Sequence, residues 1–197
     1  AVFYAPVVAS VVAVSVVWRY ILQKDGLLNS LLAVFGIAGP DWLHDTRYAL
    51  PALMVMTIWR NMGTLMIIFL AGLQAIPEDM LEAAKIDGAS RWQTLWKVTI
   101  PNVMPSITIC TFLSLTNGFK LFDQNLALTG GQPYTILSDG SSIKETEMLA
   151  LNILNTFYGQ NANSRGTAQA KAVLFFILVA TIGLLQLSAN RKKEVQQ

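Results

Sequence analysis

Residues 76–101 read IPEDMLEAAKIDGASRWQTLWKVTIP, a polar and amphipathic stretch that lies between two strongly apolar segments. Its first half predicts a helix, because Pro77 suits a first helical turn and the two acidic residues after it complement the positive end of the helix dipole. Gly88 suits the left-handed residue that ends such a helix. The stretch therefore begins with a short helix and a glycine turn.

A second helix is predicted directly after this turn. Ser90 and Gln93 have the S-x-x-Q spacing of a capping box. The helix would present Trp92 and Trp96 and is expected to end near Pro101. The resulting helical hairpin could rest on lipid head groups through its tryptophans, or it could dock into a groove of a partner protein.

The composition of the whole chain is that of a membrane protein. Of its 197 residues, 53% are hydrophobic and 13% are charged, and the mean hydropathy is +0.47. Soluble domains carry about 25% charged residues. The net charge of +2 is too small to favour nucleic-acid binding, and a single cysteine, Cys110, excludes a disulfide within the chain.

Long segments of low charge predict an all-α integral membrane protein with about four transmembrane helices. Each segment has about the 20 residues that a helix needs to cross a bilayer. The predicted spans are residues 1–20, 50–73, 101–126 and 170–190. Because Ala1 lies inside an apolar run without an initiating Met, we expect the chain to be part of a longer polypeptide.

The basic residues at the C-terminus predict the orientation of the chain. Arg191, Lys192 and Lys193 favour a cytoplasmic end. The hairpin of residues 76–101 would then be cytoplasmic, and the loops 21–49 and 127–169 would lie outside. Within the first outer loop, LLNSLLAVFGI is too short to span and is expected to lie along the interface as a short helix. The second loop is predicted to be a lid with little structure of its own.

The sequence EAAKIDGASRWQTLWKVTIP resembles the signature loop of the integral-membrane subunits of ATP-binding-cassette importers. That pattern reads E-A-A, three residues, Gly, nine residues, then I-x-L-P. This chain departs from it by valine for isoleucine and isoleucine for leucine, and matches in register at Glu82, Ala83, Ala84, Gly88, Val98, Ile100 and Pro101. The flanking WLHDTRYALPALMVMTIW and LTGGQP look like the maltose-type, carbohydrate-uptake branch.

The resemblance implies a permease subunit that forms the path for a sugar or oligosaccharide in a prokaryotic cell membrane. Permeases of this branch usually have six spans, so the first two would be missing. The partners implied are a second permease subunit, two cytoplasmic ATPase subunits and an extracytoplasmic solute-binding protein. The chain has no G-x-x-x-x-G-K-[ST] phosphate loop, so the ATPase is expected to be a separate chain that binds ATP and magnesium. No cofactor is expected on this chain.

The resemblance also implies which residues couple the permease to its ATPase. The signature loop would be a coupling helix that docks in a cleft of the ATPase, with Glu82 making a polar contact and Gly88 providing the turn. The implied coupling residues are Glu82, Ala83, Ala84, Asp87, Gly88 and Pro101. The alanines favour docking because small side chains allow a close backbone approach.

Polar residues inside the spans are candidates for the substrate pathway, since lipid-facing placement is costly. By resemblance, Asn117, Gly118 and Lys120 lie where the maltose-type permease contacts sugar. Lys120 either pairs with Asp123 or favours an acidic substrate group. Further candidates are Asn152 and Asn155, which share one helical face and could equally be interfacial polar residues. Arg60 is a weaker candidate, because a helix-packing or snorkelling arginine is the more common interpretation there.

An enzyme is not expected from this inventory of side chains. His44 is the only histidine, and it lies among polar residues of an outer loop without a nucleophile–base motif. The remaining alternatives are a permease for another solute, such as a glycerol phosphate or a peptide, and a passive channel or scaffold.

Overall fold

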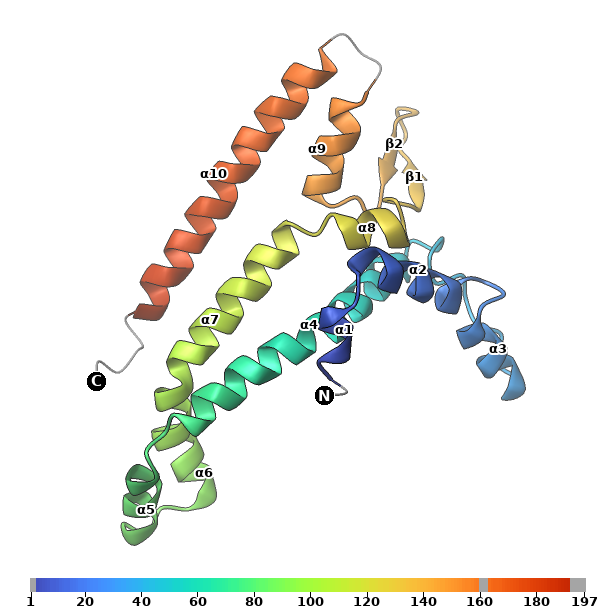
Figure 1. Cartoon of the computed structure of the whole chain (residues 1–197). Helices are drawn as coiled ribbons and strands as arrows, with labels where there is room; N and C mark the ends of the chain where they lie inside the picture. The colour runs from blue at the N-terminus through green and yellow to red at the C-terminus, as the bar shows by residue number, and fades with distance from the viewer. Residues whose placement is uncertain (1–2, 160–162, 192–197) are drawn as a thin grey trace. The chain divides into compact units, whose positions relative to one another are not determined.

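The computed structural model describes residues 3–159 and 163–191, and it is mostly helical with one small two-stranded sheet. The chain divides into two compact units (Figure 1). The first unit is Ala1–Gly63 with Phe119–Phe175, and the second unit is Thr64–Gly118 with Phe176–Gln197. Two long helices contribute to both units: α4 (Ala49–Gln74) and α10 (Ser164–Arg191).

Three helices in the described residues are long and apolar enough to cross a membrane: Ala49–Gln74, Arg91–Phe119 and Ser164–Ser188. They correspond to three of the four predicted spans. The first predicted span, residues 1–20, differs: it forms α1 (Ala5–Val8) and α2 (Val11–Leu22). At about 1.5 Å per residue, the 12 residues of α2 are too few to cross about 30 Å of hydrocarbon.

The break between α1 and α2 lies at two extended residues, Ala9 and Ser10. Ser10 occupies the N-cap position of α2 without a capping hydrogen bond from its side chain. The many valines nearby have a lower helix propensity than leucine or alanine. They weaken a continuous helix, and nothing else in the local sequence compels the break.

The third predicted span also has different bounds. It begins at Arg91 and ends at Phe119 instead of running over residues 101–126. Residues 120–122 leave the helix, and α8 (Asp123–Leu128) begins with Asp123 in its first turn. Lys120 is thus a loop residue. The neighbouring Leu121 is drawn away from the helix because it packs against the hydrophobic core of the first unit.

That core joins segments that are far apart in the sequence. Leu53 and Met56 of α4 are fully buried, at helical spacing, against Leu22 from α2 and Leu128 from α8. Trp18, Leu28, Trp42 and Met148 pack around them. The core therefore holds parts of the two loops, residues 21–49 and 127–169, against the start of α4.

The second outer loop was expected to have little structure, and this expectation is wrong. It contains the antiparallel strands β1 (Tyr134–Ile136) and β2 (Ser142–Lys144), followed by α9 (Leu149–Phe157) and the first turns of α10 (Figure 1). Buried hydrogen bonds hold this region together. The Asn125 amide donates to the Thr146 carbonyl at 2.7 Å, and its oxygen accepts from the Met148 N–H at 3.0 Å.

Replacing Asn125 with alanine is expected to destabilise the first unit by about 2–4 kcal/mol, because it leaves several buried polar groups without partners. Asn125 is fully buried and also donates to Thr129 Oγ1 at 3.1 Å. The measurement is the melting temperature of the purified protein. The matched control is Leu126→Ala, since Leu126 is the next residue and is exposed; an equal loss in both variants would contradict the role of Asn125.

Candidate functional site

The hairpin begins with α5 (Glu78–Ile86), which follows Pro77 and carries its acidic residues in the first turn, as predicted. Asp87 is the C-cap, and Gly88 has a φ of +73°. The Ala89 N–H then donates back to the Ala84 carbonyl at 3.0 Å. This bond closes a glycine-terminated helix end, so the predicted turn at Gly88 is confirmed.

The capping box that starts the second helix is also confirmed. The Ser90 N–H donates to Gln93 Oε1 at 2.8 Å, and the Gln93 N–H donates to Ser90 Oγ at 3.3 Å. Both bonds join neighbouring residues, which is why the sequence alone could predict them. The helix that follows is α6 (Arg91–Thr94).

The second helix does not stop near Pro101, contrary to the prediction. It continues through a π-helical segment η1 (Leu95–Thr99) into α7 (Ile100–Phe119). The Ile100 N–H donates to the Leu95 carbonyl, five residues back. We attribute the tolerance of Pro101 to this wider turn, because proline interrupts the usual four-residue ladder. The second helix of the hairpin and the span therefore form one uninterrupted helix, Arg91–Phe119.

Within the second unit, α4 and α7 approach closely just above the hairpin. An added Cβ at Gly72 would lie 2.2 Å from Ser106 Oγ. Only glycine fits this contact without displacing one of the two helices. The two helices that lead into and out of the hairpin are thus in close contact at Gly72 and Ser106.

The two alanines of the signature differ in exposure. Ala84 is buried within the second unit, whereas Ala83 and Glu82 are exposed. Successive helical residues point about 100° apart, so only Ala83 of the pair lies on the free face. Five large apolar side chains of the hairpin are exposed, and the most exposed is Ile86, at 86%. They are Met80, Ile86, Trp92, Leu95 and Trp96. Both tryptophans of the second helix, Trp92 and Trp96, are mostly exposed.

The candidate pathway residues of α7 lie at its C-terminal end. Asn117 and Gly118 are exposed, and a Cβ at Gly118 would meet nothing within 4 Å. Lys120 follows in the break before α8 and is also exposed. Among the described side chains, the ion pairs are His44–Asp41 and Lys144–Glu147, so Lys120 and Asp123 do not pair.

Asn152 and Asn155 are brought together on α9, as their spacing predicted, by a residue that the sequence analysis missed. Both amides donate to the carboxylate of Glu147, and the Asn152 bond is 2.6 Å long. Lys171 Nζ donates to Asn152 Oδ1 at 2.8 Å and to Thr156 Oγ1 at 2.9 Å. Asn152 therefore bridges an anion and a cation.

The pKa of Glu147 reflects this environment. Burial raises the pKa, but the hydrogen bonds from Asn152 and Asn155 and the charge of Lys144, 3.3 Å away, bring it below its usual value. Glu147 is therefore a carboxylate at neutral pH. Its signal in the sequence was weak: an acidic residue just before an amphipathic apolar helix.

Arg60 lies on the packed face of α4 and not on a lipid-facing one. It falls in helical register with the buried Leu53, Met56 and Gly63. In the described part of the chain its Nε is buried and has no hydrogen-bond partner. A snorkelling role in lipid does not fit this position.

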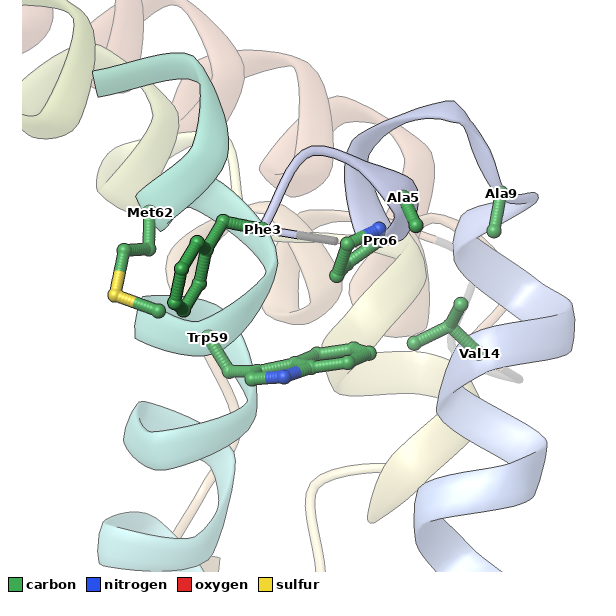
Figure 2. A pocket seen from close by; sticks show the side chains of 7 residues that line it. All are labelled: Phe3, Ala5, Pro6, Ala9, Val14, Trp59 and Met62. Carbon is green, nitrogen blue, oxygen red and sulfur yellow. The ribbon is translucent and has the colours of Figure 1, made fainter. Parts of the chain in front are cut away.

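An apolar pocket lies beside the break between α1 and α2. In Figure 2 the Trp59 ring lies along one side, with Phe3 and Met62 near one end and Val14 near the other. Ala5, Pro6 and Ala9 complete the lining. Its lining side chains offer almost no hydrogen-bonding groups for a sugar hydroxyl.

Comparison with known families decides the class of protein. The family model described as "binding-protein-dependent transport system inner membrane component" matches residues 2–194. The chain belongs to this family. Membership together with the three apolar helices makes it a multi-pass membrane protein, as predicted. The family consists of non-enzymatic membrane subunits, so the prediction that the chain is not an enzyme is confirmed.

Two similar members of the family are named as sugar permeases. The probable starch degradation products transport system permease protein AmyD of Thermoanaerobacterium thermosulfurigenes is 36% identical over 98% of this chain and 62% of the relative. The multiple sugar-binding transport system permease protein MsmF of Streptococcus mutans is 33% identical over 98% of this chain and 63% of the relative. The chain thus spans less than two thirds of these relatives.

The fold has a counterpart in a solved structure. A bacterial ABC transporter that imports the acidic polysaccharide alginate has a chain with a TM-score of 0.77, at 22% identity, over 96% of this chain and 63% of that one. This likeness confirms the fold of an ABC-transporter membrane subunit.

Proposed function

We propose that this chain is the membrane permease part of an ATP-driven importer and forms the translocation path for a sugar or oligosaccharide. The observation that carries the proposal is the hairpin of residues 76–101. It is a pair of helices joined by a glycine turn, with Glu82 and several apolar side chains exposed, and its second helix continues into α7. The sugar-permease names of the family members support the cargo class.

In this proposal the hairpin couples the spans to a separate ATPase subunit. Glu82, Ala83 and Asp87 would face the ATPase, and Ala84 would hold the hairpin together. Gly88 would form the turn at its tip, and Pro101 would lie where the second helix passes into the span. Since α6, η1 and α7 are one helix, a displacement of the docked hairpin would pass directly into a span. ATP binding would then shift the balance between two conformations of the translocation path.

The proposed orientation places the hairpin and the C-terminus in the cytoplasm. The support is the basic group at residues 191–193, of which Lys192 and Lys193 lie outside the described residues. The outer region with α8, α9 and the β-hairpin would face an extracytoplasmic solute-binding protein, in keeping with the name of the family. A second permease subunit would complete the path.

The test is co-purification and transport. The full-length permease should purify with a nucleotide-binding subunit, and vesicles holding the assembled complex and its solute-binding protein should accumulate sugar only when ATP is supplied. Sugar flux that is indifferent to ATP would indicate a passive channel and would overturn the proposal. ATP-driven uptake of a glycerol phosphate or a peptide in place of sugar would overturn the cargo class alone.

The proposed pathway residues are Asn117, Gly118 and Lys120, together with Asn152 and Asn155 as amides held by Glu147. Asn117→Ala is expected to raise the KM for uptake by about tenfold, which corresponds to the loss of one buried hydrogen bond to the sugar. Assembly should be unchanged because Asn117 is exposed in this chain. The control is Gln74→Ala, because Gln74 is an exposed amide at the end of a different span, α4. Equal uptake kinetics in the two variants would remove Asn117 from the pathway.

A further inference from the structure

Helix α3 (Leu27–Val34) and the turn after it present an apolar surface. Among the described residues nothing covers this surface: Leu27 is 59% exposed, Leu31 53% and Val34 79%. These residues recur at the spacing of one helical stripe. With the exposed Phe35 and Ile37, they make up what we call the α3 surface.

The opposite face of α3 is fixed in place by hydrogen bonds. The Asn29 amide donates to the carbonyls of Lys24 at 2.9 Å and Pro40 at 3.0 Å, and its oxygen accepts from Trp42 Nε1 at 2.7 Å. Leu28 packs against the core of the first unit. The α3 surface therefore cannot turn inward without breaking these bonds.

Trp42, which donates to Asn29 of α3, also fixes the position of α3 relative to the start of the membrane helix α4. Trp42 packs edge-to-face on Tyr48, with ring centroids 5.4 Å apart. Tyr48 directly precedes Ala49, the first residue of α4. Helix α3 is thus tied to the point where α4 enters the bilayer. Aromatic and basic residues of the kind found at this depth are also present, in Arg19, Tyr20 and Arg47.

We propose that the α3 surface inserts into the outer face of the lipid bilayer and anchors this end of the first unit at the head-group boundary. Amphipathic helices lie in this way, with the apolar face about 5–10 Å deep. Residues 19–48 carry three basic and three acidic side chains, so their formal charges cancel. Insertion is therefore driven by apolar contact with acyl chains, and zwitterionic lipid is sufficient.

Spin labels test this proposal in the full-length permease, assembled with its partners in phosphatidylcholine vesicles. The background lacks native thiols: Cys110, the single cysteine of these 197 residues, is replaced with alanine, and so are any cysteines in the rest of the permease and in its partners. Labels are placed at Leu31→Cys and Val34→Cys, and at Lys24→Cys as the matched control on the same loop. Collision with oxygen, which concentrates in lipid, should exceed collision with a water-soluble nickel chelate at residues 31 and 34. The order should reverse at residue 24.

Two outcomes would overturn the proposal. If the nickel chelate collides more often than oxygen at residues 31 and 34, the α3 surface faces water. If both reagents are excluded there, another protein chain covers it. Neither outcome depends on ATP-driven uptake. The spin-label experiment therefore tests this inference independently of the proposed function.

Discussion

Replacing Gly88 with aspartate is expected to reduce sugar uptake about tenfold or more while ATP hydrolysis by the partner subunit continues. Gly88 lies at the exposed tip of the hairpin with a φ of +73°, and a Cβ there would meet nothing within 4 Å. Aspartate tolerates this backbone conformation better than most residues, so the hairpin should still fold. The added carboxylate would lie beside Asp87 in the proposed docking surface, where an unpaired buried charge costs several kcal/mol.

The measurement is ATP-driven uptake in vesicles beside ATPase activity of the same preparation, and uptake should fall about tenfold or more. Gly140→Asp is the matched control, because Gly140 also has a positive φ, of +81°, with nothing within 4 Å, but lies at the tip of the β-hairpin. Normal uptake by Gly88→Asp would contradict the coupling role of the hairpin. A similar loss in both variants would show that backbone strain alone is responsible.

The second large effect is expected at Glu147. Replacing it with alanine leaves the amides of Asn152 and Asn155 without their acceptor and Lys144 without its ion pair. Hydrogen bonds to charged groups contribute about 1.5–3 kcal/mol each when one partner is removed. We expect a lower melting temperature of the complex and reduced uptake, with partial recovery in Glu147→Gln, since one amide oxygen can still accept.

The control for this substitution is Glu145→Ala, two residues earlier in the chain and exposed. It should leave both the melting temperature and the uptake unchanged. If Glu147→Ala behaves in the same way, the carboxylate does not hold α9.

The same carboxylate predicts a dependence of stability on pH. Because the pKa of Glu147 is lower in the folded protein than its usual 4.5, the stabilisation is fully present above pH 4.5 and is lost as the pH falls through the folded value. The difference in melting temperature between the native protein and Glu147→Gln should therefore shrink on acidification below pH 4.5. A difference that stays constant from pH 7 to about 3.5, which spans the usual titration range of a glutamate, would contradict this role of the charge.

Local cues explain what could be predicted from the sequence. The turn at Gly88 and the capping box of Ser90 and Gln93 are made by residues within five positions of each other, so the pattern contains both partners of each bond. The three long apolar segments were predictable for the same reason, because crossing a bilayer is a property of one continuous helix. The family signature lies entirely within such a local stretch.

The features that could not be predicted depend on partners distant in the chain. Asn125 bonds to Thr146, and Lys171 reaches Asn152 from another helix. Their residue types are common, and no spacing rule joins them. The exit of Lys120 from α7 likewise follows from the packing of the neighbouring Leu121 against the core.

Sequence alone was therefore sufficient for the hairpin of residues 76–101, and with it for the family. Tertiary packing decided the burial of Ala84 and the packing of Leu28 of α3 against the core. The physical reason is the distance along the chain between interacting residues. Caps and turns are stabilised by neighbours in sequence. A side chain's final partner depends on which distant surfaces the folded chain brings together.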